Sequence, residues 1–169
     1  LYGKNVAEVG VGKPVTSKGF HSYEMKIKEL PVTLFDSWGL EVGKEKEWMN
    51  DLENELNKRG VDKPASEWFH SVFYCINSGG ARIEDCDKEI IKKFMDHKYA
   101  VSVILTKADQ ISEEDESKLK TVLQKMFSEI DVIAVCSEDK TTRSGPTKPF
   151  GKGDVELKAY RDFFQSLIN

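Results

Sequence analysis

Two acidic residues that follow apolar runs are the first candidates for chemistry in this sequence. The run 32–35 leads into Asp36, with Gly39 three residues later, and the run 101–105 is followed four residues on by Asp109. Such runs are typical of buried parallel strands, and open α/β sheets bind ligands at the carboxyl ends of those strands. An acid held there can bind a hydrated Mg²⁺, and a glycine just beyond it lets a backbone N–H approach a phosphate.

These residues must be positioned by secondary structure, and the sequence predicts strands and helices that alternate along most of the chain. The sequence predicts strands over 20–29, 32–36, 70–77, 99–105 and 130–136, and helices over 45–59, over 85–98, from Ser112 and from Asp154. The first two strands are joined by a short link and are expected to form an antiparallel hairpin. The hairpin and the alternation after it predict an α/β fold with a mostly parallel sheet, helices on both faces and one antiparallel strand. Residues 138–153 are expected to form a loop.

Each predicted helix carries apolar residues at helical spacing, which is more typical of a core-facing stripe than of a binding surface. In chain order the stripes are Trp48, Leu52 and Leu56; Ile90, Ile91, Phe94 and Met95; Leu119, Val122, Leu123, Met126 and Phe127; and Leu157, Tyr160, Phe164, Leu167 and Ile168.

Composition narrows the classes of function. With 169 residues, 39% hydrophobic and 32% charged, the chain suits a single globular domain. Its net charge of −4 argues against nucleic acid as a partner. No run reaches the roughly 18 apolar residues of a transmembrane segment and no signal-peptide pattern is present, so we expect a cytoplasmic protein. The widely spaced Cys75, Cys86 and Cys136 are expected to be reduced thiols, with Cys75 and Cys136 in core strands.

Taken in order, four motifs resemble the G domain of the small GTPase superfamily, the broad group that includes Era, septins and immunity-related GTPases. The motifs are Thr16 in a polar loop, Asp36-Ser37-Trp38-Gly39, Thr106-Lys107-Ala108-Asp109 and Cys136-Ser137-Glu138. They match four of the family's five motifs and span nearly the whole chain. The resemblance implies a three-layer α/β/α fold of the P-loop NTPase type that binds GTP or GDP with Mg²⁺.

The resemblance also implies which residues contact the guanine base of the nucleotide. Asp109 would accept two hydrogen bonds from guanine, a donor pair that adenine lacks. The aliphatic stem of Lys107 would lie along the base, and Thr106 would tie neighbouring loops together. Backbone N–H groups around Ser137 and Glu138 would reach the guanine oxygen.

At the phosphates, the resemblance implies that Asp36 binds Mg²⁺ through a water and that Thr16 coordinates it directly. The Gly39 N–H would meet the γ-phosphate. Residues 5–18 and 37–47 would then be the two switch segments, ordered by the γ-phosphate.

The sequence departs from the family at several positions. Trp38 stands where Pro is common, Thr106 where Asn is usual and Glu138 where Ala is usual. The Trp38 indole is interpreted either as a hydrophobic lid or as a partner contact. Leu40 stands where some relatives use Gln to orient water, so hydrolysis is expected to be slow or to need an activating partner, and no catalytic residue is assigned. Arg82 is interpreted as a surface charge or a partner contact.

The phosphate-binding loop Gly-x-x-x-x-Gly-Lys-Ser/Thr is absent from the sequence. The segment 10–14 resembles only its tail, and Pro14 occupies the required hydroxyl position. We therefore expect a first strand, the loop and most of a helix, roughly 25–40 residues, to lie upstream of Leu1. Without that loop the chain alone is expected to bind GTP poorly and to be inactive.

Two functions of different classes stay open. One is a guanine-nucleotide-dependent switch. Its full-length protein would hydrolyse GTP slowly and interact with an unidentified effector or activating protein. The other is a truncated or degenerate G domain that acts as a non-catalytic protein-interaction module. A receiver-type signalling domain is disfavoured, because no acid cluster gathers at the end of the first strand.

Overall fold

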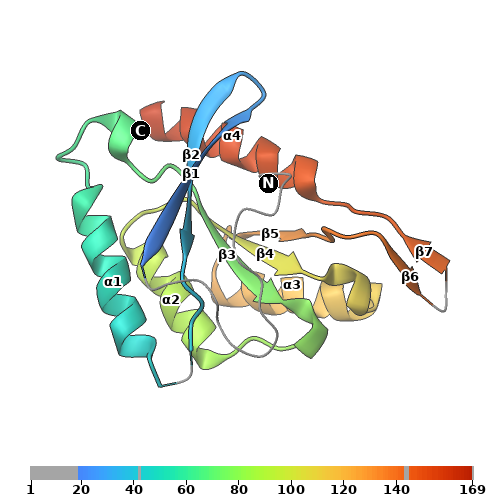
Figure 1. Ribbon diagram of the computed structural model, residues 1–169. Coiled ribbons are helices and arrows are strands. Elements are labelled where there is room, and N and C mark those ends of the chain that lie inside the picture. Colours follow the sequence, from blue (N-terminus) through green and yellow to red (C-terminus); the bar gives the residue numbers. More distant parts are fainter. Residues whose placement is uncertain (1–18, 42, 143–144, 169) are drawn as a thin grey trace. The chain divides into compact units, whose positions relative to one another are not determined.

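The computed structural model describes residues 19–41, 43–142 and 145–168 of the chain (Figure 1). Contacts divide the chain after Phe69 into two compact units. The candidate Mg²⁺ ligand Thr16 and the candidate switch 5–18 lie outside the described residues.

The first unit is built on an antiparallel hairpin and one helix, as the sequence predicts. Strand β1 (Phe20–Ile27) pairs with β2 (Leu30–Ser37). Helix α1 (Glu45–Lys58) buries its predicted stripe of Trp48, Leu52 and Leu56. Acids in its first turn and a lysine in its last complement the helix dipole. A short 3₁₀ turn, η1 (Ala65–Glu67), follows.

Three parallel strands form the sheet of the second unit. They are β3 (Val72–Asn77), β4 (Val101–Thr106) and β5 (Asp131–Ala134), in the spatial order β3-β4-β5. The register pairs Asn77 with Thr106, and Leu105 with Ala134. The carboxyl ends of the three strands therefore lie at one edge of this sheet, and two of them, those of β4 and β5, lead into predicted motifs.

Helices cover both faces of this sheet, as expected. Helices α2 (Asp85–Asp96), α3 (Glu113–Met126) and α4 (Lys152–Ile168) agree with the predicted elements. In Figure 1, α4 runs along one side of the sheet, and α2 and α3 lie on the other. The fold class predicted from the sequence is thus confirmed, with parallel strands, an antiparallel hairpin and four helices.

The burial of β3 differs from the expectation of a core strand. Among the described strands it pairs with β4 alone, and Cys75 on it is exposed, whereas Cys136 is buried as expected. Strand order depends on which strands pair, and an apolar run such as Val-Phe-Tyr-Cys-Ile does not encode its neighbours.

Residues 138–153 are not a plain loop. They contain a small antiparallel hairpin of β6 (Lys140–Thr142) and β7 (Gly145–Thr147). Strands of three residues are too short for alternation to be recognised in the sequence.

Two predicted apolar stripes are only partly buried. In α3, Leu119 and Leu123 are buried, but Val122 and Met126 are exposed. In α4, Val155 is buried, while several predicted core residues are exposed: Leu157, Phe164, Leu167 and Ile168.

A polar network explains the orientation of α4. Asp162 is 5% exposed and accepts hydrogen bonds from the Ser71 hydroxyl (2.5 Å) and the Lys158 ammonium (2.6 Å). Lys158 also pairs with Asp131 at the start of β5 (2.9 Å). These contacts turn a face containing charged residues toward the sheet, which an apolar stripe alone does not predict.

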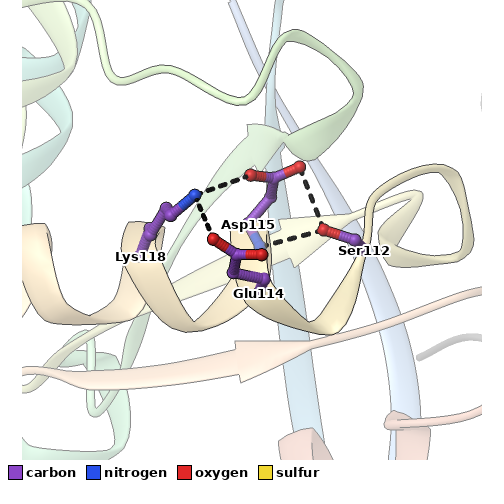
Figure 2. A network of polar contacts seen from close by, with 4 residues as sticks. All are labelled: Ser112, Glu114, Asp115 and Lys118. Atoms are coloured by element: carbon purple, nitrogen blue, oxygen red, sulfur yellow. Dashed lines mark hydrogen bonds and ion pairs between the residues drawn. The ribbon is translucent and has the colours of Figure 1, made fainter.

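Helix α3 begins directly after Ser112, in agreement with the prediction, and this residue caps it. The Ser112 Oγ accepts a hydrogen bond from the Asp115 N–H (3.1 Å), and its hydroxyl donates to the Asp115 carboxylate (3.0 Å). Figure 2 shows these contacts together with the ion pairs that Lys118 makes with Glu114 and Asp115. Because the cap fixes the first turn of α3, it also fixes the end of the loop that leads from β4.

No helix in the described part of the chain is both long and apolar enough to cross a membrane.

Candidate functional site

The predicted site residues fall into two groups, one in each compact unit. In the first unit, Asp36 is the second-last residue of β2 and Gly39 follows the strand. In the second unit, Thr106 ends β4 and is followed by Lys107 and Asp109, and the predicted residues Ser137 and Glu138 lie beyond β5.

The loop after β4 has a defined conformation. Lys107 adopts a left-handed backbone conformation, with φ 54° and ψ 38°, which is unfavourable for a residue with a side chain. A 3₁₀ turn, η3 (Ala108–Gln110), follows at once and contains the half-buried Asp109. The Gln110 N–H donates to the Lys107 carbonyl (3.0 Å), which closes the turn.

The loop after β5 lies directly beside it. The Val135 N–H donates to the Leu105 carbonyl (2.9 Å), and the Ala108 N–H donates to the Val135 carbonyl (3.1 Å). Two loops that are far apart in the sequence are thereby joined at the carboxyl ends of β4 and β5. The structure thus brings together the two groups of residues that, by the family resemblance, would contact the guanine base.

The buried thiol of Cys136 shapes the second loop. Cys136 exchanges backbone hydrogen bonds with Phe150, and its thiol donates to the Glu138 carbonyl (3.3 Å). The side chains of Ser137 and Glu138 are exposed. Cys136 therefore holds the turn in which the backbone N–H groups of residues 137 and 138 are presented.

The turn after β3 is a part of this edge that the sequence analysis missed. The fully buried Ser78 donates its hydroxyl to the Thr106 carbonyl (2.6 Å). The Thr106 hydroxyl in turn donates to the Ile76 carbonyl (3.3 Å). The side chain of Thr106 therefore ties the end of its strand to the neighbouring strand. The signal in the sequence is a small hydroxyl residue directly after the predicted strand 70–77.

Gly151 is a second missed residue. Its φ is +86°, and a Cβ at this position would collide with the Ala134 carbonyl oxygen and the side chain of Val135. The chain entering α4 therefore packs against the end of β5, next to the Ser137 loop. Only glycine combines this backbone conformation with so close an approach.

In the first unit, Asp36 is half-buried at the end of β2 and faces His21 in the strand register. Burial raises the pKa of Asp36, and the charge of His21 opposes this effect. A cation near a partly buried carboxylate stabilises its charged form. No group of three or more His, Cys, Asp or Glu side chains suited to a metal occurs among the described residues. Mg²⁺ bound with a nucleotide commonly uses one or two carboxylates plus waters and phosphate oxygens, so a single aspartate fits such an ion.

Trp38 is neither a lid nor an exposed partner contact in the first unit. It is 1% exposed, and its indole N–H donates to the Asp51 carboxylate on α1 (3.0 Å). Its carbonyl accepts a hydrogen bond from the indole N–H of Trp48 (3.0 Å), and its backbone N–H donates to the Gly19 carbonyl (3.1 Å). The residue therefore fastens the segment after Asp36 to α1.

Gly39, which follows, is exposed and has no left-handed backbone conformation. A Cβ built on it would meet no described atom within 4 Å. Within the part of the chain that the structure describes, neither backbone conformation nor packing requires glycine here.

Comparisons with known proteins bear on the fold. No family model matches the sequence, and no curated protein matches it. Among solved structures, the chain is similar to a septin GTPase domain from Chlamydomonas reinhardtii, with a TM-score of 0.53 and 13% sequence identity. The match covers 87% of this chain and 73% of the septin chain. The chain therefore has a G-domain-like α/β fold.

Proposed function

We propose that this chain forms a G domain that binds GTP or GDP with Mg²⁺ and acts as a nucleotide-dependent switch. The observation that carries the proposal is the hydrogen bond from the Ala108 N–H to the Val135 carbonyl (3.1 Å). It joins the two loops whose residues suit a guanine base, at the sheet edge where α/β proteins bind ligands.

Recognition of the base rests on Asp109. Its carboxylate can accept hydrogen bonds from both guanine N1–H and the exocyclic amine, and charge assistance strengthens both bonds. The exposed Lys107 can lay its stem along the ring. Backbone N–H groups at Ser137 and Glu138 can donate to the guanine oxygen. Adenine offers an acceptor where guanine offers N1–H, so the same site disfavours ATP.

Recognition of the phosphates falls to the residues after β2. Asp36 would hold Mg²⁺ through a water, together with Thr16, and the Gly39 N–H would donate to the γ-phosphate. Bound Mg²⁺ would neutralise charge on the phosphate oxygens. Hydrolysis is expected to be slow without an activating partner.

The test is a change of base specificity in the full-length protein. Calorimetry compares GTP, ATP and xanthosine triphosphate for the wild type and for Asp109→Asn. Xanthine carries an oxygen in place of the guanine amine, so an amide donor at this position should favour it. We expect the wild type to prefer GTP and the variant to prefer xanthosine triphosphate.

A matched control is Asp85→Asn, which removes an exposed carboxylate that pairs with Lys88 at the start of α2. This control should keep the preference for GTP. Equal binding of GTP and ATP by the wild type, or an unchanged preference in Asp109→Asn, contradicts the proposal.

The second candidate function is a non-catalytic protein-interaction module with the same fold. The absence of a phosphate-loop motif from these 169 residues favours it, as does the unusual Glu138 at the base-binding loop. A full-length protein that binds none of the three nucleotides would support this alternative.

A further inference from the structure

Two tryptophan side chains hold the peptide group that joins Trp38 to Gly39. The indole N–H of Trp48 donates to the Trp38 carbonyl oxygen at 3.0 Å, in a buried position. The indole of Trp38 is anchored in turn by its 3.0 Å hydrogen bond to Asp51. Trp48 and Asp51 are three residues apart on α1, so both anchors come from one side of that helix.

This contact fixes the direction of the next N–H. The carbonyl of Trp38 and the N–H of Gly39 belong to one planar peptide group, and no cis peptide occurs in the described ranges. In a trans peptide the carbonyl and the N–H point in opposite directions. Because Trp48 holds the carbonyl oxygen, it also sets where the Gly39 N–H points.

We propose that Trp48 is a positioning residue for recognition of the γ-phosphate. The inference rests on the proposed function, in which the Gly39 N–H donates to the γ-phosphate. A γ-phosphate that engages this N–H orients the peptide from one side, and Trp48 orients it from the other. The two contacts favour the same orientation and therefore strengthen each other.

A purely structural role predicts a different outcome. If the Trp48 contact only stabilises the packing of β2 against α1, its loss lowers stability and affects every nucleotide alike. A positioning role affects the triphosphate selectively, because GDP has no γ-phosphate to meet Gly39. The ratio of the two affinities separates these roles.

The first test uses Trp48→Phe in the full-length protein, which keeps an aromatic ring and removes the N–H donor. Affinities are measured with GDP and with GTPγS, a slowly hydrolysed triphosphate, both in the presence of Mg²⁺. We expect binding of GTPγS to weaken about fivefold, the ratio that one net hydrogen bond supports, with binding of GDP unchanged.

The matched control is Trp68→Phe. Trp68 also donates its indole N–H to a backbone carbonyl in the first unit, that of Lys63 (2.8 Å). This bond lies outside the segment after Asp36, so the control should change neither affinity.

A second measurement uses the wild-type side chains and does not depend on the folding of a variant. The chain has three tryptophans, and fluorotryptophan labelling gives each a separate ¹⁹F signal. We expect GTPγS to shift the Trp48 signal relative to GDP, and to leave the Trp68 signal in place.

The outcomes separate this inference from the function on which it rests. A wild type that binds neither nucleotide overturns the proposed function and this inference together. A wild type that binds both, with GTPγS and GDP weakened equally or not at all in Trp48→Phe, overturns this inference alone. So does a Trp48 signal that is the same with both nucleotides.

Discussion

Two glycine substitutions should have opposite effects on stability and on binding. Gly39→Ala adds a methyl group with no described atom within 4 Å, on a backbone without a left-handed φ, whereas Gly151→Ala places one against the end of β5 at φ +86°. The first glycine is proposed to meet a phosphate. The second sets the packing of the chain entering α4.

The magnitudes follow from these surroundings. Replacing Gly39 by Ala reduces the freedom of the unfolded chain, so the free energy of unfolding should stay the same or rise by up to about 1 kcal/mol. Replacing Gly151 combines a left-handed alanine, about 1–3 kcal/mol, with a collision against a backbone carbonyl, so a loss of about 3 kcal/mol is expected.

Binding should show the reverse order. A methyl group on Gly39 stands where the γ-phosphate is proposed to approach. Loss of one hydrogen bond to a charged group, about 1.5–3 kcal/mol, corresponds to a loss of roughly 10- to 150-fold in GTPγS affinity. The affinity for GDP should change little.

Denaturant unfolding and calorimetry of the two full-length variants check both expectations. A Gly39→Ala protein that is destabilised by more than about 1 kcal/mol would refute the account of its surroundings. A stable Gly39→Ala protein that binds GTPγS as the wild type does would refute the proposed phosphate contact. An equally stable Gly151→Ala protein would refute the close packing of the α4 entry.

Three further substitutions test the packing of the second unit, each by denaturant unfolding. Asp162→Ala should lower the free energy of unfolding by about 2–3 kcal/mol, because it leaves Lys158 and the Ser71 hydroxyl without a buried acceptor, and an unchanged stability would contradict this. Ser102→Ala should be neutral or stabilise by about 1 kcal/mol, because the Ser102 hydroxyl is buried in β4 without a hydrogen-bond partner among the described groups. Ser112→Ala should cost about 1 kcal/mol through loss of the α3 cap, and no loss would mean that the cap contributes nothing.

The sequence was sufficient to predict features that depend on local periodicity. Three such features are the β1–β2 hairpin, the spacing of Trp48, Leu52 and Leu56 on α1, and the Ser112 cap. Each depends only on residues that lie close together in the sequence. Asp36 and the Thr106–Asp109 segment also lie at the ends of their predicted strands.

Features that depend on distant contacts were not predictable in this way. The hydroxyl of Ser78 reaches Thr106 across 28 residues, and Asp162 reaches Ser71 across 91. The burial of Trp38 likewise depends on Asp51, 13 residues further along the chain. No spacing rule connects residues so far apart. The contacts that hold the loops of the candidate site in place, such as those of Ser78 and Trp38, therefore follow only from the three-dimensional structure.

Backbone amide chemical shifts of the full-length protein, titrated with GDP and with ADP, test the central claim most directly. The account predicts that GDP shifts the amides of Lys107, Asp109, Ser137 and Glu138, and that ADP at the same concentration leaves them in place. Shifts of equal size with ADP, or GDP-induced shifts that spare both loops, would contradict it.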